Sequence, residues 1–175
     1  YILVSHNSLL NFGPSDDFSI SMWVKPEITQ VSNNGNVDFI GKWSDNGAGN
    51  PPYPFAIRLA TAFSANQTNG CVGSHRFDQT CSNHYFEYAN TTPINDLQWH
   101  HVVMVKDADS VRLYIDNTQL LVGYDVTSCS TSNTEPMYIG NRGGTFNPAD
   151  YYGAIDDIGI YNCALSPGEV GDLFT

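Results

Sequence analysis

Basic residues are scarce in this chain of 175 amino acids. Seven Lys and Arg stand against eighteen Asp and Glu, which gives a formal net charge of −11, and the basic residues form no cluster along the sequence. Proteins that bind nucleic acid neutralise its phosphates with Lys and Arg, so a nucleic-acid partner is not expected. The acidic excess favours solubility, with cation binding as the alternative for some of the carboxylates.

Long hydrophobic runs are also lacking. No apolar segment approaches the roughly 20 residues that a membrane-spanning helix needs, so no membrane insertion is expected. The chain begins at Tyr1 without a segment of signal-peptide character, which predicts a processed or excised part of a larger parent chain or assembly. A mass of 19.3 kDa fits a single domain over residues 1–175, large enough to bury a core of its own.

The four cysteines lack the C-x-x-C spacing of zinc and redox sites, and they allow three pairings. One pair brackets a polar stretch, and the other would tie a loop to the last predicted strand. The preferred pairing is Cys71–Cys81 with Cys129–Cys163. The alternative is four free, buried thiols in a cytosolic protein.

Two glycosylation sequons, at Asn66 and Asn90, occur in a chain rich in Asn and Thr. Together with the predicted disulfides they favour an extracellular, secreted or surface-exposed protein, although sequons of this kind also arise by chance.

What the chain has in abundance is the alternation of apolar and polar residues that is typical of strands. Segments with this pattern cover residues 17–26, 37–43, 55–63, 84–90, 99–107, 110–116, 118–126, 136–142 and 153–161. Residues 64–83 are polar and are predicted to be a long loop insertion stapled by the first cysteine pair. Only the segment from Ser166 to Phe174 is predicted to be helical, because Ser166, Pro167 and Glu169 form a capping box with Pro at the first position.

Many strands, very short turns between 99 and 126, and no alternation of strands with helices predict an all-β fold. The expected architecture is a two-sheet antiparallel jelly-roll sandwich with one short C-terminal helical turn.

Five phrases in order along the chain, "DFSISMWVKP", "FIGKW", "WHHVVMVKDADSVRLYIDNTQL", "MYIGNRGG" and "YYGAIDDIGIYNCALSPGEV", carry a family resemblance. The chain resembles the laminin-G-like, concanavalin A-like jelly-roll family of lectin and adhesion domains over nearly its whole length. The resemblance predicts the fold. It does not single out a function, because domains of this fold occur in lectins, adhesion proteins, enzymes and structural proteins.

One acidic residue in the last predicted strand needs a partner. Strict alternation would place Asp156 on the face that Ile158 and Ile160 mark as buried, and a buried carboxylate is costly when unpaired. The resemblance implies a structural calcium ion at this position, with further ligands in the segment from Gly41 to Asp45 or around Asn7. The alternative is an Asp that accepts backbone amide hydrogen bonds or pairs with a basic residue.

Catalysis is not expected. Retaining glycosidases of the family that the chain resembles carry a strand with the motif Glu-x-Asp-x-x-Glu. This chain lacks that spacing, because its four glutamates, Glu27, Glu87, Glu135 and Glu169, are far apart. No serine lies in a nucleophile elbow, and no Gly-rich phosphate loop follows a strand. His100 and His101 lie at the start of a core strand, which favours a structural role for both.

Loop aromatics interleaved with planar polar side chains are the candidates for glycan binding, since sugars stack on aromatic faces and receive forked hydrogen bonds. The residues singled out are Arg142, Asn147, Tyr151, Tyr152, Trp43 and Tyr53. The expected function is therefore a non-catalytic, calcium-binding carbohydrate-recognition or adhesion domain of a larger extracellular protein. The alternative is a structural or protein-interaction module, such as a virion or appendage decoration or spike domain, without a sugar site.

Overall fold

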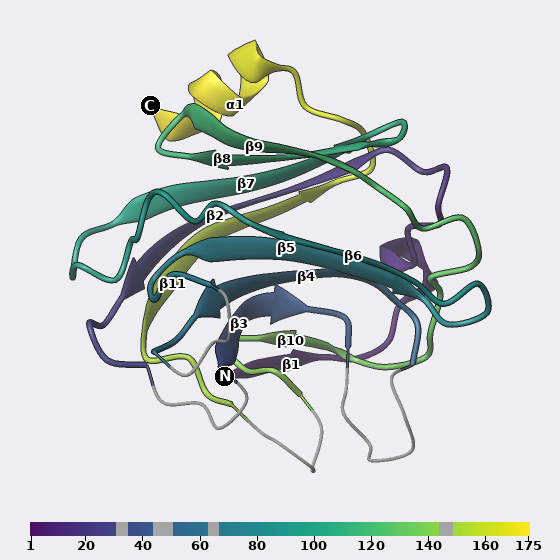
Figure 1. Cartoon of the computed structure of the whole chain (residues 1–175), viewed down its shortest axis with the longest axis horizontal. Helices are drawn as coiled ribbons and strands as arrows, with labels where there is room; N and C mark the ends of the chain where they lie inside the picture. Colours follow the sequence, from purple (N-terminus) through teal and green to yellow (C-terminus); the bar gives the residue numbers. More distant parts are fainter. Residues whose placement is uncertain (31–34, 44–50, 63–66, 144–148) are drawn as a thin grey trace.

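The computed structural model describes residues 1–30, 35–43, 51–62, 67–143 and 149–175. The chain forms two antiparallel sheets stacked face to face (Figure 1). The six-stranded sheet has the order β1 (Ile2–Val4), β10 (Met137–Ile139), β3 (Asn36–Gly41), β4 (Tyr53–Ala60), β5 (Val72–Asp78) and β6 (Asn83–Tyr88). The five-stranded sheet has the order β11 (Gly153–Tyr161), β2 (Phe18–Pro26), β7 (His100–Asp107), β8 (Ser110–Ile115) and β9 (Thr118–Tyr124). The predicted jelly-roll sandwich is confirmed.

Alternation along the strands builds the core between the sheets. In β2, Phe18, Ile20, Met22 and Val24 are fully buried and face the other sheet, as their spacing of two residues predicts. The hairpins that join β7, β8 and β9 make the predicted meander, with each strand antiparallel to the next.

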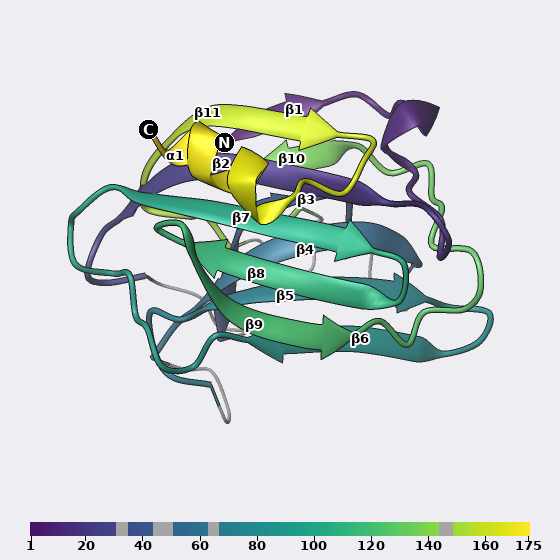
Figure 2. The same ribbon diagram turned by 90° about the horizontal axis from the view of Figure 1, so that it is seen from above.

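The C-terminal helix α1 (Pro167–Phe174) covers part of the outer face of the five-stranded sheet (Figures 1 and 2). The Ser166 side chain accepts a hydrogen bond from the Glu169 backbone, and the Glu169 carboxylate accepts one from the Ser166 backbone, so the predicted capping box is present. Val170 of α1 packs against Val103 and Val105 of β7. A short 3-10 helix, Ser8–Leu10, follows β1. No described helix is long and apolar enough to cross a membrane.

A bulge in β11 overturns the expected placement of Asp156. The register with β2 shifts between Asp156 and Gly159, and Asp157 takes the left-handed backbone conformation, with φ of 47°. The extra residue reverses the alternation, so Ile155 and Ile158 both pack against the core, whereas Asp156 is exposed. The prediction that Asp156 shares the buried face was wrong, because strict period-two alternation fails at a bulge.

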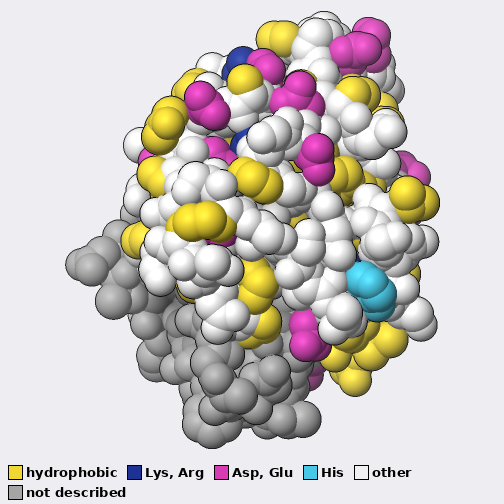
Figure 3. Space-filling view, turned by 90° about the vertical axis from the view of Figure 1, so that its right-hand side faces the viewer, with side chains coloured by type: hydrophobic (Ala, Val, Ile, Leu, Met, Phe, Trp, Pro, Cys, Tyr) yellow, Lys and Arg dark blue, Asp and Glu magenta, His cyan; other side chains and the backbone are white. Residues whose placement is uncertain are grey.

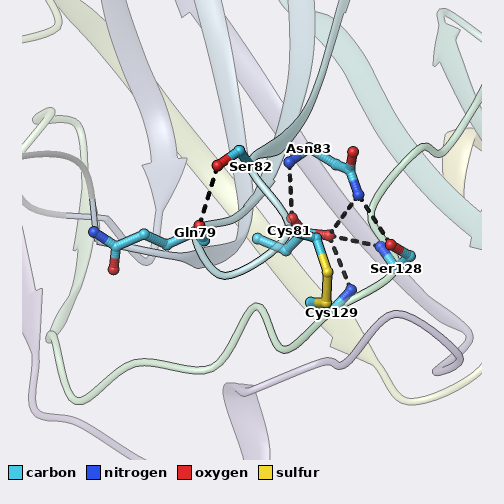
Figure 4. The surroundings of a disulfide bond; sticks show 7 residues. Gln79, Cys81, Ser82, Asn83, Ser128 and Cys129 are labelled. Atoms are coloured by element: carbon cyan, nitrogen blue, oxygen red, sulfur yellow. Dashed lines mark hydrogen bonds between the residues drawn. A yellow bond between two sulfur atoms is a disulfide. The ribbon is translucent and has the colours of Figure 1, made fainter.

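The predicted loop insertion at 64–83 was wrong for its central part, because Val72–Asp78 form β5, inside the six-stranded sheet. The predicted pairings Cys71–Cys81 and Cys129–Cys163 are wrong as well. Cys71 precedes β5 and Cys81 follows it, so the length of the strand, roughly 20 Å, separates them. The structure pairs Cys81 with Cys129, whose Cα atoms lie 5.8 Å apart (Figure 4), and leaves Cys71 buried and Cys163 exposed as free thiols.

Thiol titration checks this pairing. We expect a thiol reagent to modify Cys163 quickly in the native protein and Cys71 only after unfolding, since Cys71 is fully buried and burial raises the pKa of its thiol. Native protein should therefore titrate one thiol, and unfolded, unreduced protein should titrate two. A native protein without a reactive thiol would contradict the pairing, and Cys163→Ser is the control that removes the fast signal.

Candidate functional site on the outer face of the six-stranded sheet

A group of polar and aromatic side chains lies on the face of the six-stranded sheet that points away from the core. Register pairs place them side by side: Asp38 of β3 is opposite Arg58 of β4, and Ala56 of β4 is opposite His75 of β5. We call this group the Arg58 face. Its members are Asp38, Trp43, Tyr53, Arg58, His75, His84, Tyr88 and Arg142.

An ion pair lies at the centre of the Arg58 face. The Arg58 Nε and Asp38 Oδ1 atoms are 2.8 Å apart, and the two side chains are only 5% and 2% exposed. Burial raises the pKa of Asp38 despite the neighbouring guanidinium. Burial alone would lower the pKa of Arg58, but the Asp38 carboxylate outweighs it and the pKa is raised. Each group therefore favours the charged form of the other, and for Arg58 this effect outweighs burial.

Two guanidinium groups stack on aromatic rings beside this ion pair. The Arg142 guanidinium carbon lies 4.7 Å from the centre of the Trp43 ring, and that of Arg58 lies 5.2 Å from the same ring and 5.8 Å from the Tyr53 ring. Trp43 and Tyr53 meet edge to face, with centroids 6.2 Å apart. Burial lowers the pKa of Arg142, and Arg58 adds to that effect by repulsion.

Hydrogen bonds fix the histidines of the Arg58 face. Tyr88 donates to Asn36 Oδ1 at 2.8 Å, so the 3.0 Å contact between Tyr88 and His75 Nε2 makes this nitrogen the donor. His75 Nδ1 is then an acceptor. His84 Nε2 is 2.8 Å from the Tyr53 hydroxyl. Burial lowers the pKa of His75 well below its ordinary value and lowers that of His84, so both rings are neutral at neutral pH.

Several buried polar atoms of the Arg58 face have no hydrogen-bond partner among the described residues. Apart from Asp38 Oδ1 and Arg58 Nε, which form the ion pair, they are Trp43 Nε1, Arg58 Nη2, His75 Nδ1, and Nε and Nη1 of Arg142. Trp43, Arg58 and His75 are each no more than 4% exposed. Buried polar atoms are nearly always paired, so this concentration of unpaired atoms makes the Arg58 face the candidate functional site.

The structure brings together three of the residues singled out from the sequence, Trp43, Tyr53 and Arg142. Tyr151 instead packs edge-on against Phe39 of the core, with centroids 5.1 Å apart, and Tyr152 is 47% exposed at the other sheet. Asn147, Asp45 and the sequon residue Asn66 lie outside the described residues. The other sequon residue, Asn90, is exposed.

The remaining members of the Arg58 face, Asp38, Arg58, His75, His84 and Tyr88, were not predicted from the sequence. A signal was present for the first two, because each is a lone charge inside an apolar strand segment, "VDFIG" and "FAIRLA". Lone charges at mid-strand need a partner, and adjacent strands supply one in register. No comparable signal marks the two histidines.

The predicted calcium ligands do not come together. Gly41 lies in β3 of the six-stranded sheet, opposite Tyr138 and Ala56, whereas Asp156 is on the exposed side of the five-stranded sheet. Asp156 Oδ1 accepts a hydrogen bond from the Asp157 backbone at 2.9 Å. Calcium takes six to eight oxygen ligands, and Gly41 and Asp156 cannot share one ion. Calcium binding stays a prediction.

His100 and His101 have partners of their own. His100 Nδ1 is 2.8 Å from Asp116 Oδ2 and its Nε2 is 3.0 Å from Asp96 Oδ1, at the end of the sheet. His101 Nε2 is 2.8 Å from Ser21 Oγ, and both of these residues are buried. A Ser–His pair without access for a substrate and without a described carboxylate at the second ring nitrogen lacks the arrangement of a hydrolytic triad.

Comparison with solved structures finds the same fold in binding domains. The CBM40 domain of the Ruminococcus gnavus IT-sialidase superposes with a TM-score of 0.70 at 13% identity, over 99% of this chain and 96% of that chain. The same domain bound to alpha2,3 sialyllactose gives 0.69 at 12% identity, with the same coverage.

Two further solved structures belong to longer chains. Domain 4 of AbnA, a GH43 extracellular arabinanase from Geobacillus stearothermophilus, in complex with arabinotriose, gives a TM-score of 0.61 at 23% identity, covering 94% of this chain and 70% of that one. The binding domain of Paraclostridial Mosquitocidal Protein 1 gives 0.64 at 18% identity, covering 98% of this chain and only 40% of that one.

No curated protein sequence matches the chain. Residues 1–171, however, match the protein-family model described as "Concanavalin A-like lectin/glucanases superfamily". Two antiparallel sheets, the phrases quoted above and this match over almost the full length agree: the chain belongs to the laminin-G-like branch of the concanavalin A-like superfamily.

Proposed function

We propose that this chain is a non-catalytic carbohydrate-recognition module that binds its glycan on the Arg58 face. The observation that carries the proposal is the set of buried polar atoms left without partners beside the rings of Trp43 and Tyr53. Sugar recognition needs this combination, because a sugar offers an apolar C–H surface to an aromatic ring and hydroxyl groups to donors and acceptors.

The unpartnered atoms supply both kinds of hydrogen bond. Arg142 and Arg58 offer N–H donors, and His75 Nδ1 offers an acceptor. The described charges of the face are two guanidinium groups against the Asp38 carboxylate, since the histidines are neutral. One positive charge in excess favours a glycan that contains a carboxylated sugar.

Relatives support this proposal without deciding it. The R. gnavus domain is solved with sialyllactose, and the arabinanase domain with arabinotriose. We further propose that the chain works as part of a larger extracellular protein. The Cys81–Cys129 disulfide supports an oxidising compartment, where such bonds persist.

A glycan-array screen followed by calorimetry tests the proposal. We expect Arg142→Gln to weaken binding of the best glycan at least about tenfold, because a hydrogen bond to a charged group contributes about 1.5–3 kcal/mol. Arg142 is half-buried and pairs with no described carboxylate, so the variant should fold. Melting curves check the fold, and arrays repeated with chelator show whether calcium is needed.

A matched control comes from the opposite sheet. Trp99→Ala removes a 43% exposed aromatic ring just before β7 and should leave glycan binding unchanged. Silence of the folded wild-type protein across neutral and acidic glycans would refute the proposal. Equal binding by Arg142→Gln and wild type would move the glycan site away from the Arg58 face.

A protein-interaction module is the second candidate. It is favoured by exposed apolar residues along the edge strand β1, where Ile2 and Leu3 are 60% and 52% exposed and the preceding Tyr1 is 77% exposed. Failure of the array together with loss of a protein partner on Ile2→Ser would favour this function.

A further inference from the structure

A cavity lies on the side of the sandwich opposite the Arg58 face, on the outer face of the five-stranded sheet. It has a volume of about 310 Å³, and its lining is Trp23, Trp99, Asp156 and Asp157. We call it the tryptophan pocket. Glycan binding on the Arg58 face does not involve any of these residues.

Trp23 and Trp99 lie close to each other because β2 and β7 are neighbouring strands. Trp23 of β2 is opposite His101 of β7 on the outer face, and Trp99, which directly precedes β7, lines the same pocket as Trp23. Trp23 is held by α1, because its ring stacks on Phe174 with centroids 5.6 Å apart and an angle of 14°. Trp99 is free to meet a ligand, since 43% of it is exposed.

The bulge in β11 supplies the carboxylates. Trp23 is in register with Asp156, and the left-handed conformation of Asp157 adds a second acidic side chain at the same place. A non-glycine residue in this conformation carries a cost in backbone energy. The result is two consecutive exposed carboxylates beside an aromatic wall.

The side chains of the tryptophan pocket favour a cationic ligand. Its side chains comprise two carboxylates, which only accept hydrogen bonds, and two indoles, each with a single N–H. Lys25 lies on the same face, two residues after Trp23, but none of the ion pairs within 4 Å in the described part of the chain joins it to either carboxylate. The pocket therefore has unneutralised negative charge.

The exterior of the protein as a whole is acidic. Four of the seven basic residues, Lys42, Arg58, Arg76 and Lys106, are buried, so the acidic side chains dominate the exterior. Figure 3 shows one face on which Asp and Glu are spread widely and Lys and Arg are hardly visible. Such a surface raises the local concentration of cations.

The walls distinguish an organic cation from a metal ion. Calcium needs six to eight oxygens, whereas half of the lining residues are indoles that offer none from their side chains. A methylated ammonium group is attracted to the face of an indole ring and buries its methyl groups there, and a nearby carboxylate adds direct attraction. The side chains of the lining offer a sugar only two N–H donors, those of the indoles, beside the two carboxylate acceptors.

We propose that the tryptophan pocket binds a small quaternary ammonium compound of the choline type. Trp99 and Trp23 contact the methylated cation, and Asp156 and Asp157 neutralise its charge. The site is independent of the glycan site, because the two lie on the outer faces of different sheets.

The test is a titration of the full chain with choline, followed by calorimetry and tryptophan fluorescence at constant ionic strength. The comparison probe is the neutral analogue of choline in which carbon replaces the nitrogen. We expect choline to bind and the neutral analogue to bind at least about fivefold more weakly, because the cation–π attraction requires the charge. Equal binding of the two probes, or no binding of choline to the folded protein, would overturn the proposal.

Two variants locate the site. Trp99→Ala should weaken choline binding at least about fivefold. Asp157→Asn should also weaken it while keeping the bulge, since Asn tolerates the left-handed conformation. Arg142→Gln is the matched control and should bind choline as wild type does. Wild-type affinity in Trp99→Ala would contradict the assignment.

Calcium provides the remaining arm of the experiment. If calcium binds and Asp156→Asn abolishes it while Trp99→Ala does not, the carboxylates serve a metal, and the choline proposal is overturned. Loss of glycan binding in Trp99→Ala would assign the pocket to the sugar instead. Either result is distinct from failure of the Arg142→Gln test, which concerns the glycan site alone.

Discussion

Asp125→Ala is expected to lower the free energy of unfolding by about 3–5 kcal/mol, because it breaks a buried ion-pair network. Asp125 follows β9 and is almost completely buried. Its Oδ2 atom lies 3.0 Å from Arg76 Nε and 3.7 Å from Lys106 Nζ, and both cationic side chains are 0% exposed. Without the carboxylate, two positive charges would remain buried beside each other.

Further contacts hold the side chains of Arg76 and Lys106 in the interior. Arg76 donates to the Gly13 carbonyl at 2.8 Å, and its guanidinium lies 5.0 Å from the centre of the Phe18 ring. Lys106 donates to the Pro14 carbonyl at 3.0 Å. Burial lowers the pKa of both groups, and the charge of Arg76 lowers that of Lys106 further. The Asp125 carboxylate offsets this cost of holding two cations in the interior.

Urea unfolding of wild type and variants measures the effect. Asp107→Ala is the matched control, because Asp107 also pairs with an arginine, Arg112, at 2.6 Å, but this pair is partly exposed and should contribute no more than about 1 kcal/mol. Adding Arg76→Met to Asp125→Ala should recover part of the loss. A cost below about 1 kcal/mol for Asp125→Ala would show that water reaches the network.

Removal of the Cys81–Cys129 disulfide is expected to have the second largest effect. The bond closes a loop with a sequence separation of 48 residues, and loop-closure entropy then predicts a stabilisation of roughly 4 kcal/mol. Cys81→Ser with Cys129→Ser should lower the free energy of unfolding by about 2–4 kcal/mol in urea titrations, because the reduced unfolded chain has more conformations.

The folded state should change little when this disulfide is absent. The Asp78 carboxylate accepts backbone hydrogen bonds from Asn83 at 2.8 Å, Ser128 at 2.6 Å and Cys129 at 2.9 Å. Burial alone would raise the pKa of Asp78, but these hydrogen bonds outweigh it and lower the pKa. The variant should therefore keep its glycan binding. Cys163→Ser, a free exposed thiol, is the control, and an equal loss in that variant would contradict the pairing.

Local patterns predicted most of the fold. The alternation in Phe18–Pro26, the tight turns between β7, β8 and β9, and the capping box of α1 each appear in the structure where the sequence placed them. These features depend on neighbouring residues alone, since side-chain alternation and helix capping act over a few positions. β5 was missed because its buried face carries Ser74 and Arg76 rather than an apolar series.

The Arg58 face was predicted only in part. Trp43, Tyr53 and Arg142 were recognised by residue type, but nothing local relates Asp38 to Arg58. Their meeting depends on the register between β3 and β4, which includes a shift between Asp38 and Ile40. A slip of one residue would send these charges to the other face of the sheet.

By itself the sequence determined the class of fold, the helix at the C-terminus and the acidic character of the protein, because these follow from local periodicity and composition. Tertiary structure alone decided which cysteines pair, which side of the sheet Asp156 occupies and which polar groups gather on each outer face. The physical reason is the same in each case. Disulfides, bulges and binding sites join residues that are distant in the chain, and only the pairing of strands in space brings those residues within reach of one another.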